Sequence, residues 1–309
     1  MTSRRYSPCI LATCVIPWNE DWSLAVEMFR REIQTLLVNL TRDLYVFGTA
    51  GEGYAVTDRQ FDEVLRVFRE ETNLPDVRAM VGVISLSLPV MIERIERASE
   101  MGFRYFQISL PSWGALNDRE LREFFKETCG RFPDASFLHY NLMRTKRLVT
   151  PEEYALLANE HPNLVAAKNS TDDTARISGL MAKAPQLQHF FTETGYGLGS
   201  QIGECGLLIS IASIHFVQAR KYFQAGQSGD RVELVARQRE LLELTQDLLA
   251  LGRSQAHMDG AYDKVFAKIH DPDFPLRLLP PYAGLTDDTF QQFIALLREK
   301  FPRWAMVNQ

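Results

Sequence analysis

Residues 163–173 read NLVAAKNSTDD and place a lysine between a strand signal and a helix signal. Leu164 to Ala167 form an unbroken apolar run, which is typical of a strand covered on both faces, as in a parallel sheet. A lysine at the carboxyl end of such a strand is costly to desolvate. Thr171 and Asp172 then supply residue types that begin helices. We therefore place Lys168 at a strand-to-helix corner, where α/β folds carry their chemistry, although a lysine that points into water fits the same local pattern.

The same alternation of strand and helix recurs over roughly the first 225 residues. The expected strands are 10–17, 43–48, 77–84, 105–110, 136–140, 164–168, 188–192 and 207–212. The expected helices are 24–40, 57–71, 88–101, 117–129, one from 150, 173–184, 195–203 and one from 214. This count and spacing predict an α/β fold, the (β/α)8 TIM barrel. A doubly wound sheet is the alternative, but its nucleotide-binding form needs GxGxxG after the first strand, where this chain has PWNE, residues 17–20.

The pattern changes after Ser228, where helical spacing continues without strands. Residues 230–251 read as one long amphipathic helix, and 258–269 and 287–301 as two more. We therefore predict a catalytic barrel domain, 1–225, followed by a C-terminal helical extension, 226–309.

Composition narrows the class of protein. The chain has 309 residues, 46% of them hydrophobic, and a net charge of −5 without a basic stripe, so we expect no nucleic-acid partner. No apolar run is long enough to span a bilayer, so we expect no membrane partner, and we interpret residues 9–17 as a strand and not a signal peptide. The four cysteines have no CxxC spacing, which favours a reduced, cytoplasmic protein. The six histidines form no ligand motif, so we expect no metal.

A barrel gathers its chemistry at the carboxyl ends of the strands. Reading only those ends gives Thr49, Trp113, Tyr140, Lys168, Glu193 and Ser210. Tyr140 and Lys168 belong to neighbouring strands, which lie about 4.8 Å apart. A lysine kept neutral by burial can attack a carbonyl, and a phenol beside it can transfer protons as a carbinolamine forms and loses water.

Four motifs, in this order, resemble those of the dihydrodipicolinate synthase / N-acetylneuraminate lyase family of class I aldolases. The motifs are GTAGE at 48–52, YN at 140–141, KNSTDD at 168–173 and GLLISIAS at 206–213. They span the whole predicted barrel. Each motif is weak alone, and the ordered set is more specific.

The resemblance implies a role for each candidate. Lys168 would form a Schiff base with a 2-oxo acid, and Tyr140 would be the proton-transfer phenol. Thr49, with backbone amides near Ala50, would bind the substrate carboxylate or relay protons. Arg144 would meet a second carboxylate, and Ile209 would lie near the imine. Glu193 and Trp113 depart from the family pattern, and we expect them to contact substrate because of their places at strand ends. The resemblance also implies a homo-oligomer, a dimer or tetramer, and no cofactor.

Departures from the family motifs argue against dihydrodipicolinate synthase itself. Ala50 stands where the family usually has a second hydroxyl residue, and Pro111-Ser112-Trp113 replaces a Pro-Tyr-Tyr segment. We therefore expect a lyase, aldolase or dehydratase, acting on pyruvate or on a 2-keto-3-deoxy sugar acid. A catalytically silent member that binds a small metabolite is the alternative. A metal-dependent barrel enzyme is a third, but only Glu193 qualifies as a ligand at the strand ends.

Overall fold

The computed structural model describes residues 5–252 and 257–305, and its core is a closed barrel of eight parallel strands in the order β1 to β8. The strands are β1 (Ile10–Thr13), β2 (Asp43–Val46), β3 (Arg78–Gly82), β4 (Tyr105–Ile108), β5 (Ser136–Asn141), β6 (Leu164–Asn169), β7 (Gln188–Phe191) and β8 (Gly206–Leu208). The predicted TIM barrel is confirmed.

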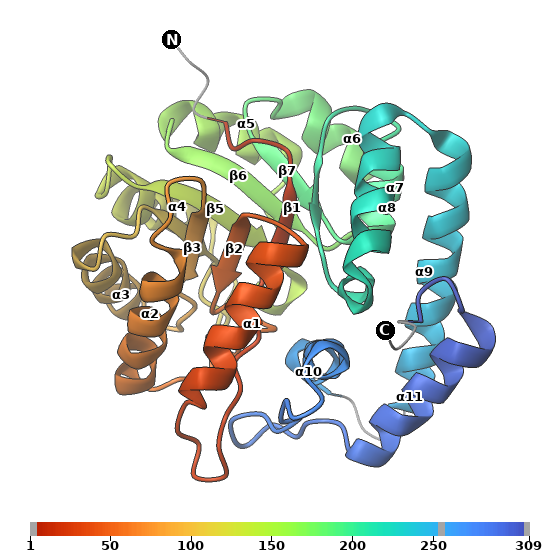
Figure 1. Cartoon of the computed structure of the whole chain (residues 1–309). Coiled ribbons are helices and arrows are strands. Elements are labelled where there is room, and N and C mark those ends of the chain that lie inside the picture. The colour runs from red at the N-terminus through yellow and green to blue at the C-terminus, as the bar shows by residue number, and fades with distance from the viewer. Residues whose placement is uncertain (1–4, 253–256, 306–309) are drawn as a thin grey trace.

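Helices enclose the strands, and further helices follow the barrel (Figure 1). Those of the barrel are α1 (Val26–Asn39), α2 (Asp58–Thr72), α3 (Leu88–Glu100), α4 (Asp118–Phe125), α5 (Pro151–Glu160), α6 (Thr174–Lys183), α7 (Glu193–Gly199) and α8 (Phe216–Ser228). The C-terminal ones are α9 (Arg231–Leu251), α10 (Asp259–His270) and α11 (Asp287–Lys300). None of the described helices is long and apolar enough to cross a membrane.

Side chains alternate between two packed layers along each strand, as the pleat requires. In β6, Ala166 belongs to a cluster inside the barrel, whereas Ala167 belongs to the larger cluster between strands and helices. Lys168, two residues after Ala166, therefore shares its interior face. The apolar strand β6, buried on both faces, thus places the Lys168 side chain in the barrel interior.

Several helix starts follow the predicted capping residues. Thr57, Asn117 and Thr150 each close a capping box with the side chain three residues later. After β6 the cap is Asp173, which accepts from the amides of Ala175 and Arg176, and not the expected Thr171 and Asp172. The loop between β6 and α6, residues 170–173, has the predicted length and begins one residue later than predicted.

Six strands, β1 to β4, β7 and β8, are shorter than predicted. The first ends at Thr13, before the predicted Pro17, and the eighth ends at Leu208, before a short 3-10 helix, η3 (Ile211–Ile214). The seventh ends at Phe191, so Glu193 begins α7 and does not end a strand. Thr192 has an extended backbone at the N-cap of α7, and an acidic first turn favours a helix start there.

The C-terminal helices pack on the barrel. Helix α9 contacts α7 and α8, and α10 contacts η3. The expected boundary at residue 225 falls inside α8, and Gly229, with a φ of 73°, ends that helix. We propose that the chain divides into a barrel and a C-terminal helical extension, with the break at Gly229. Residues 1–4, 253–256 and 306–309 lie outside the described residues.

A buried ion pair fixes α10 to the loop after β2. Lys264 Nζ lies 2.7 Å from Glu52 Oε1, and both side chains are fully buried. Glu52 also accepts from Trp18 Nε1 at 2.9 Å and from the Leu279 amide at 2.6 Å. A Cβ at Gly260 would lie 2.9 Å from the Ala50 carbonyl oxygen, so only glycine allows α10 to approach this loop so closely.

We expect Glu52→Gln to destabilise the protein by about 3–5 kcal/mol, because it leaves the buried Lys264 ammonium without its counter-charge. Equilibrium unfolding in urea, followed by circular dichroism, measures the change. Glu27→Gln is the control, because that side chain is 82% exposed and its loss should leave the midpoint unchanged. Equal midpoints for Glu52→Gln and the wild-type protein would show that the pair does not hold α10.

Candidate active site

Lys168 is the centre of the site. It is 4% exposed and lies directly opposite Tyr140 in the register of β5 and β6. Its Nζ lies 3.6 Å from the centre of the Tyr140 ring and 5.3 Å from that of Tyr45 on β2. A long hydrogen bond of 3.5 Å joins Nζ to Tyr45 Oη. Two aromatic rings thus confine the amine inside the barrel, where cation–π attraction stabilises its charged form.

The charge state of Lys168 differs from the prediction. Burial lowers its pKa, but Tyr140, Tyr45 and the Asp259 carboxylate together raise it more, so the pKa lies above the usual lysine value. The expectation that burial alone would lower the pKa is therefore wrong for the free protein. The amine is an ammonium at neutral pH and must transfer a proton before it can attack a carbonyl.

The Tyr140 hydroxyl is available for proton transfer. The residue is 3% exposed, and its hydroxyl makes no hydrogen bond to any residue that the structure describes. Its neighbour Asn141 is different, because its amide group bonds Val149 and Asn169 at 2.9 Å and closes the outer side of the two strands. The strand pair is thus held on its outer face and leaves the phenol free on its inner face.

Helix α10 brings two acids to the site that the sequence analysis did not select. Asp263 is 6% exposed and electrostatically coupled to both Lys168 and Tyr45. Burial raises its pKa well above the usual value; Asp259 and Glu193 raise it further, and Lys168 and Ser210 lower it. A cavity of about 460 Å³ adjoins both aspartates and Glu193.

The loop after β2 places Thr49 beside a second cavity and Ala50 against α10. Phe47 and Glu52 have positive φ values of 63° and 54°, so the chain makes a strained, tight turn between them. Thr49 is 4% exposed and lines a cavity of about 190 Å³ together with Arg144. Ala50 is 8% exposed and lies under Gly260 of α10.

An ion pair between Arg144 and Asp259 links the two cavities. Arg144 lies in a short 3-10 helix, η2 (Met143–Thr145), after β5 and pairs with Asp259 of α10, with 2.9 Å between Nη2 and Oδ1. Arg144 lines the smaller cavity and Asp259 the larger one. The Arg144 guanidinium thus lies beside the smaller cavity, where it pairs with the Asp259 carboxylate.

Glu193 braces the segment after β8. Its Oε1 accepts from the amides of Ser210 at 2.7 Å and Ala212 at 3.1 Å, and its carbonyl accepts from Tyr222 Oη at 2.7 Å. Its Oε2 makes no hydrogen bond to another described residue, and the side chain lines the larger cavity. Burial raises the pKa of this carboxyl, and the two amides oppose the rise.

Two predicted site residues lie elsewhere. Ile209 belongs to the core cluster between strands and helices, because it follows the interior residue Leu208 and points the other way. Trp113 lies on the loop after β4 with 82% of its side chain exposed, and not at a strand end facing the cavity. Ile209 thus faces away from the barrel interior, and Trp113 lies five residues beyond the end of β4.

The model of the Dihydrodipicolinate synthetase family matches residues 7–299. The chain belongs to this family.

Relatives with assigned names are distant. A 4-hydroxy-tetrahydrodipicolinate synthase of Exiguobacterium sp. is 28% identical over 170 residues, which cover 55% of this chain and 57% of that protein. One from Thermosynechococcus vestitus is 24% identical over 255 residues, covering 77% of this chain and 81% of the relative. The chain thus spans little more than half the length of the first of these.

Solved structures of two other proteins share the fold. A prophage protein of E. coli K12, in complex with pyruvate, has a TM-score of 0.84 at 16% identity and covers 95% of this chain and 98% of its own. A catalytic-lysine mutant of Ruminococcus gnavus sialic acid aldolase has a TM-score of 0.82 at 15% identity, covering 98% and 99%. At these identities the likeness concerns the barrel and its C-terminal helices alone.

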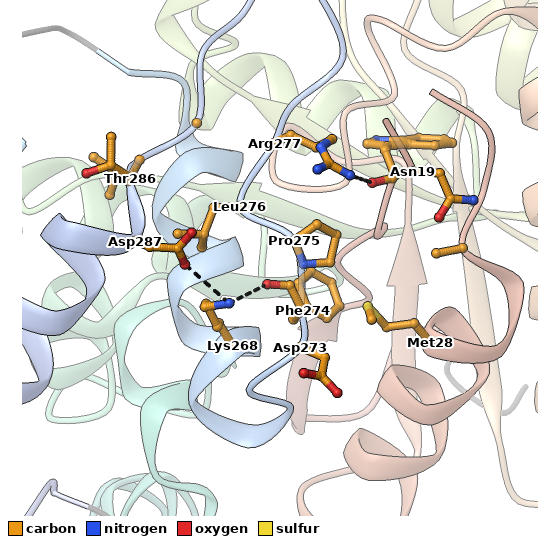
Figure 2. A pocket seen from close by; sticks show the side chains of 14 residues that line it. Asn19, Met28, Lys268, Asp273, Phe274, Pro275, Leu276, Arg277, Thr286 and Asp287 are labelled. Atoms are coloured by element: carbon orange, nitrogen blue, oxygen red, sulfur yellow. Dashed lines mark hydrogen bonds and ion pairs between the residues drawn. The ribbon is translucent and has the colours of Figure 1, made fainter. Parts of the chain in front are cut away.

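A further cavity, of about 690 Å³, lies away from Lys168 (Figure 2). Several of its polar groups bond one another: Lys268 donates to the Phe274 carbonyl and pairs with Asp287, and Arg277 donates to the Trp18 carbonyl. No three His, Cys, Asp or Glu side chains form a metal-ligand group within residues 5–252 and 257–305.

Sequence reasoning missed Tyr45, Asp259 and Asp263 for two different reasons. Tyr45 precedes the end of its strand, and only strand ends were read. Asp263 lies among the buried residues Ala261 and Val265 of α10, so an acid on the apolar face of an amphipathic helix was the available signal.

Proposed function

We propose that the chain is a Schiff-base-forming lyase, an aldolase or dehydratase, that acts on a 2-oxo acid through an imine on Lys168. The main observation in support of this proposal is the buried Lys168 amine, which lies 3.6 Å from the centre of the Tyr140 ring inside the barrel. Family membership supports the same chemistry, since the relatives named above are synthases and an aldolase. Pyruvate or a 2-keto-3-deoxy sugar acid is the proposed kind of substrate.

The residues divide the chemistry as follows. After losing a proton, Lys168 Nζ attacks C2 of the oxo acid, and the Tyr140 hydroxyl delivers a proton to the carbinolamine oxygen, which leaves as water. The protonated imine then withdraws electrons from C3, which makes carbon–carbon cleavage or loss of water at the next carbon feasible. Thr49 and the amides near Ala50 receive the substrate carboxylate, and Arg144 is placed for a second one.

A screen of 2-oxo acids with borohydride trapping tests this function. Each acid is incubated with the protein, reduced with sodium borohydride, and the intact mass and the digest are measured. We expect a permanent mass increase on the peptide that contains Lys168 for pyruvate and for the true substrate. Reversible binding of these acids without any adduct would instead support the silent metabolite-binding protein.

Glu193 is proposed to contact substrate through the oxygen that does not hold the loop. We expect Glu193→Gln to keep the fold, because an amide oxygen can still accept from Ser210 and Ala212. A charge-assisted hydrogen bond to a substrate hydroxyl would be weakened, so kcat/KM should fall by roughly tenfold. Glu243→Gln on the exposed face of α9 is the control. Unchanged kinetics on the substrate found by the screen would leave Glu193 with its bracing role alone.

A homo-oligomer, dimer or tetramer, is proposed for the assembled enzyme. The exposed Trp113 ring is of the type that subunit contacts bury. Multi-angle light scattering at micromolar concentration should give a mass of two or four times 35.3 kDa. A mass of one chain would contradict this proposal.

We also propose a cytoplasmic location, because the four cysteines are buried and unpaired. Cell fractionation tests this location.

A further inference from the structure

The Tyr45 hydroxyl is the only hydrogen-bond partner of the Lys168 amine within the part of the chain that the structure describes. Tyr45 Oη lies 3.5 Å from Lys168 Nζ, and both side chains are buried. Tyr140 contacts the same nitrogen differently, through the face of its ring, whose centre lies 3.6 Å away. The two phenols therefore act on the amine in different ways, Tyr45 through its oxygen and Tyr140 through its ring.

Packing holds the Tyr45 ring in place. Tyr45 is on β2 and belongs to the cluster inside the barrel, together with Met80 and Leu138. Gly48 lies against the ring, since a Cβ at this position would be 2.5 Å from Tyr45 Cε2. Glycine thus allows the loop after β2 to cover the ring closely. A ring packed in this way has little freedom to turn its hydroxyl away from Lys168.

The hydrogens on the Lys168 nitrogen define what a neighbouring acceptor can do during the reaction. The ammonium and the oxo acid together give a protonated imine and one water molecule. Two of the three nitrogen hydrogens leave in that water, and the third stays on the imine nitrogen. The imine carries a positive charge, and withdraws electrons strongly, only while it keeps this hydrogen. An acceptor beside the nitrogen therefore stabilises both the ammonium and the protonated imine.

We propose that Tyr45 positions the Lys168 nitrogen in both states, an inference that rests on the proposed function. Its hydroxyl oxygen accepts from the ammonium in the free enzyme and from the single N–H of the protonated imine in the adduct. Because that N–H points to Tyr45, C2 of the substrate takes another direction at the trigonal nitrogen and points away from β2. Tyr45 is thus a positioning residue, and the proton transfers remain with Tyr140.

Four titratable side chains act on Lys168: Tyr45 of β2, Tyr140 of β5, and Asp259 and Asp263 of α10. Burial opposes the ammonium, but the two phenols and Asp259 favour it more, so the pKa of Lys168 is raised. Burial raises the pKa of Tyr45 as well, so its phenol is neutral and its oxygen can accept. Burial also raises the pKa of Asp263, which makes this carboxyl a weak counter-charge. Loss of the Tyr45 hydroxyl should therefore release the amine at lower pH.

The pH dependence of adduct formation by the full-length protein tests this assignment. Pyruvate is added to the wild type and to Tyr45→Phe from about pH 6 to about pH 11, which spans the ordinary lysine pKa. Initial rates are measured by borohydride trapping and intact mass. Phenylalanine keeps the ring and removes only the acceptor. We expect the midpoint of the rise in rate to move to lower pH by about one unit, the scale of a hydrogen bond to a charged group.

Deuterium exchange reports the imine state in the same way. In D₂O, loss of the pyruvate methyl signal in proton NMR, divided by the amount of trapped adduct, measures how well the imine activates C3. This ratio should fall at high pH as the imine loses its hydrogen, and the fall should come about one unit lower in Tyr45→Phe. Tyr45→Leu also removes the ring and its cation–π attraction, so it should move both midpoints further in the same direction.

Tyr196→Phe is the control, because it removes a buried hydroxyl that donates to the Phe223 carbonyl between α7 and α8. Its melting temperature should fall while both midpoints keep their wild-type values, as expected for a purely structural loss. Unchanged midpoints in Tyr45→Phe and Tyr45→Leu would overturn the positioning role. Folded Tyr45→Phe protein without any adduct would overturn it too, since the hydroxyl would then act in imine formation itself. If the wild-type protein gives no pyruvate adduct at Lys168, the proposed function fails and this inference fails with it.

Discussion

Lys168→Ala should lose essentially all turnover and all borohydride-trapped adduct. No other amine among the described residues lies between the two tyrosine rings, so no substitute can form the covalent intermediate. The variant should remain folded, because truncation removes a desolvated charge that has no carboxylate within ion-pair distance in the described chain. Melting curves, turnover on the substrate found by the screen, and adduct mass are the three measurements.

Lys183→Ala is the matched control, since that lysine lies at the end of α6 with 52% of its side chain exposed. It should keep full activity. The wild-type rate of adduct formation should also rise with pH through the neutral range, because the pKa of Lys168 lies above its usual value and more amine is released as pH increases. Adduct on another lysine, or good turnover by Lys168→Ala, would refute the mechanism.

Tyr140→Phe should slow turnover by roughly 10²–10⁴-fold, the scale expected for a lost proton-transfer group. Phenylalanine keeps the ring against the Lys168 ammonium, so the substitution removes the hydroxyl and little else. Because the hydroxyl makes no hydrogen bond within the described chain, its loss should leave the stability of the fold unchanged. The measurement is the rate of adduct formation with pyruvate, together with the turnover rate.

Tyr105→Phe is the control for this experiment. Tyr105 begins β4 at the other end of the barrel and packs edge-on against Tyr6, with ring centres 5.5 Å apart. Its substitution should leave adduct formation unchanged. If Tyr140→Phe and Tyr105→Phe form adduct equally fast, the proton needed for imine formation comes from another group.

The fold and the lysine–tyrosine pair could be predicted from the sequence because both depend on local order. Apolar runs that alternate with amphipathic helices indicate a closed parallel sheet, and consecutive strands of such a barrel are neighbours. Tyr140 and Lys168 end consecutive strands, so their opposition in the register follows from the count of strands. Helix caps at Thr57, Asn117 and Thr150 are likewise short-range hydrogen bonds that adjacent residues specify.

Strand ends and side-chain directions were less predictable. Whether Glu193 closes a strand or opens a helix depends on how far β7 and β8 remain paired, and that pairing stops at Phe191. An error of one residue at a strand end reverses the direction of a side chain. Ile209 faces the helices for this reason, since the residue before it, Leu208, faces the barrel interior.

The sequence by itself thus determined the barrel, the order of its strands and the amine–phenol pair. Only the tertiary structure decided what surrounds that pair. Asp263 lies 95 positions after Lys168 in the chain, and no local pattern joins them. The position of α10, which carries Asp263, results from the buried Lys264–Glu52 pair and the close packing of Gly260 on Ala50. The charge state of Lys168 was decided in the same way, because a pKa depends on all charges and dipoles near the group and not on its neighbours in sequence.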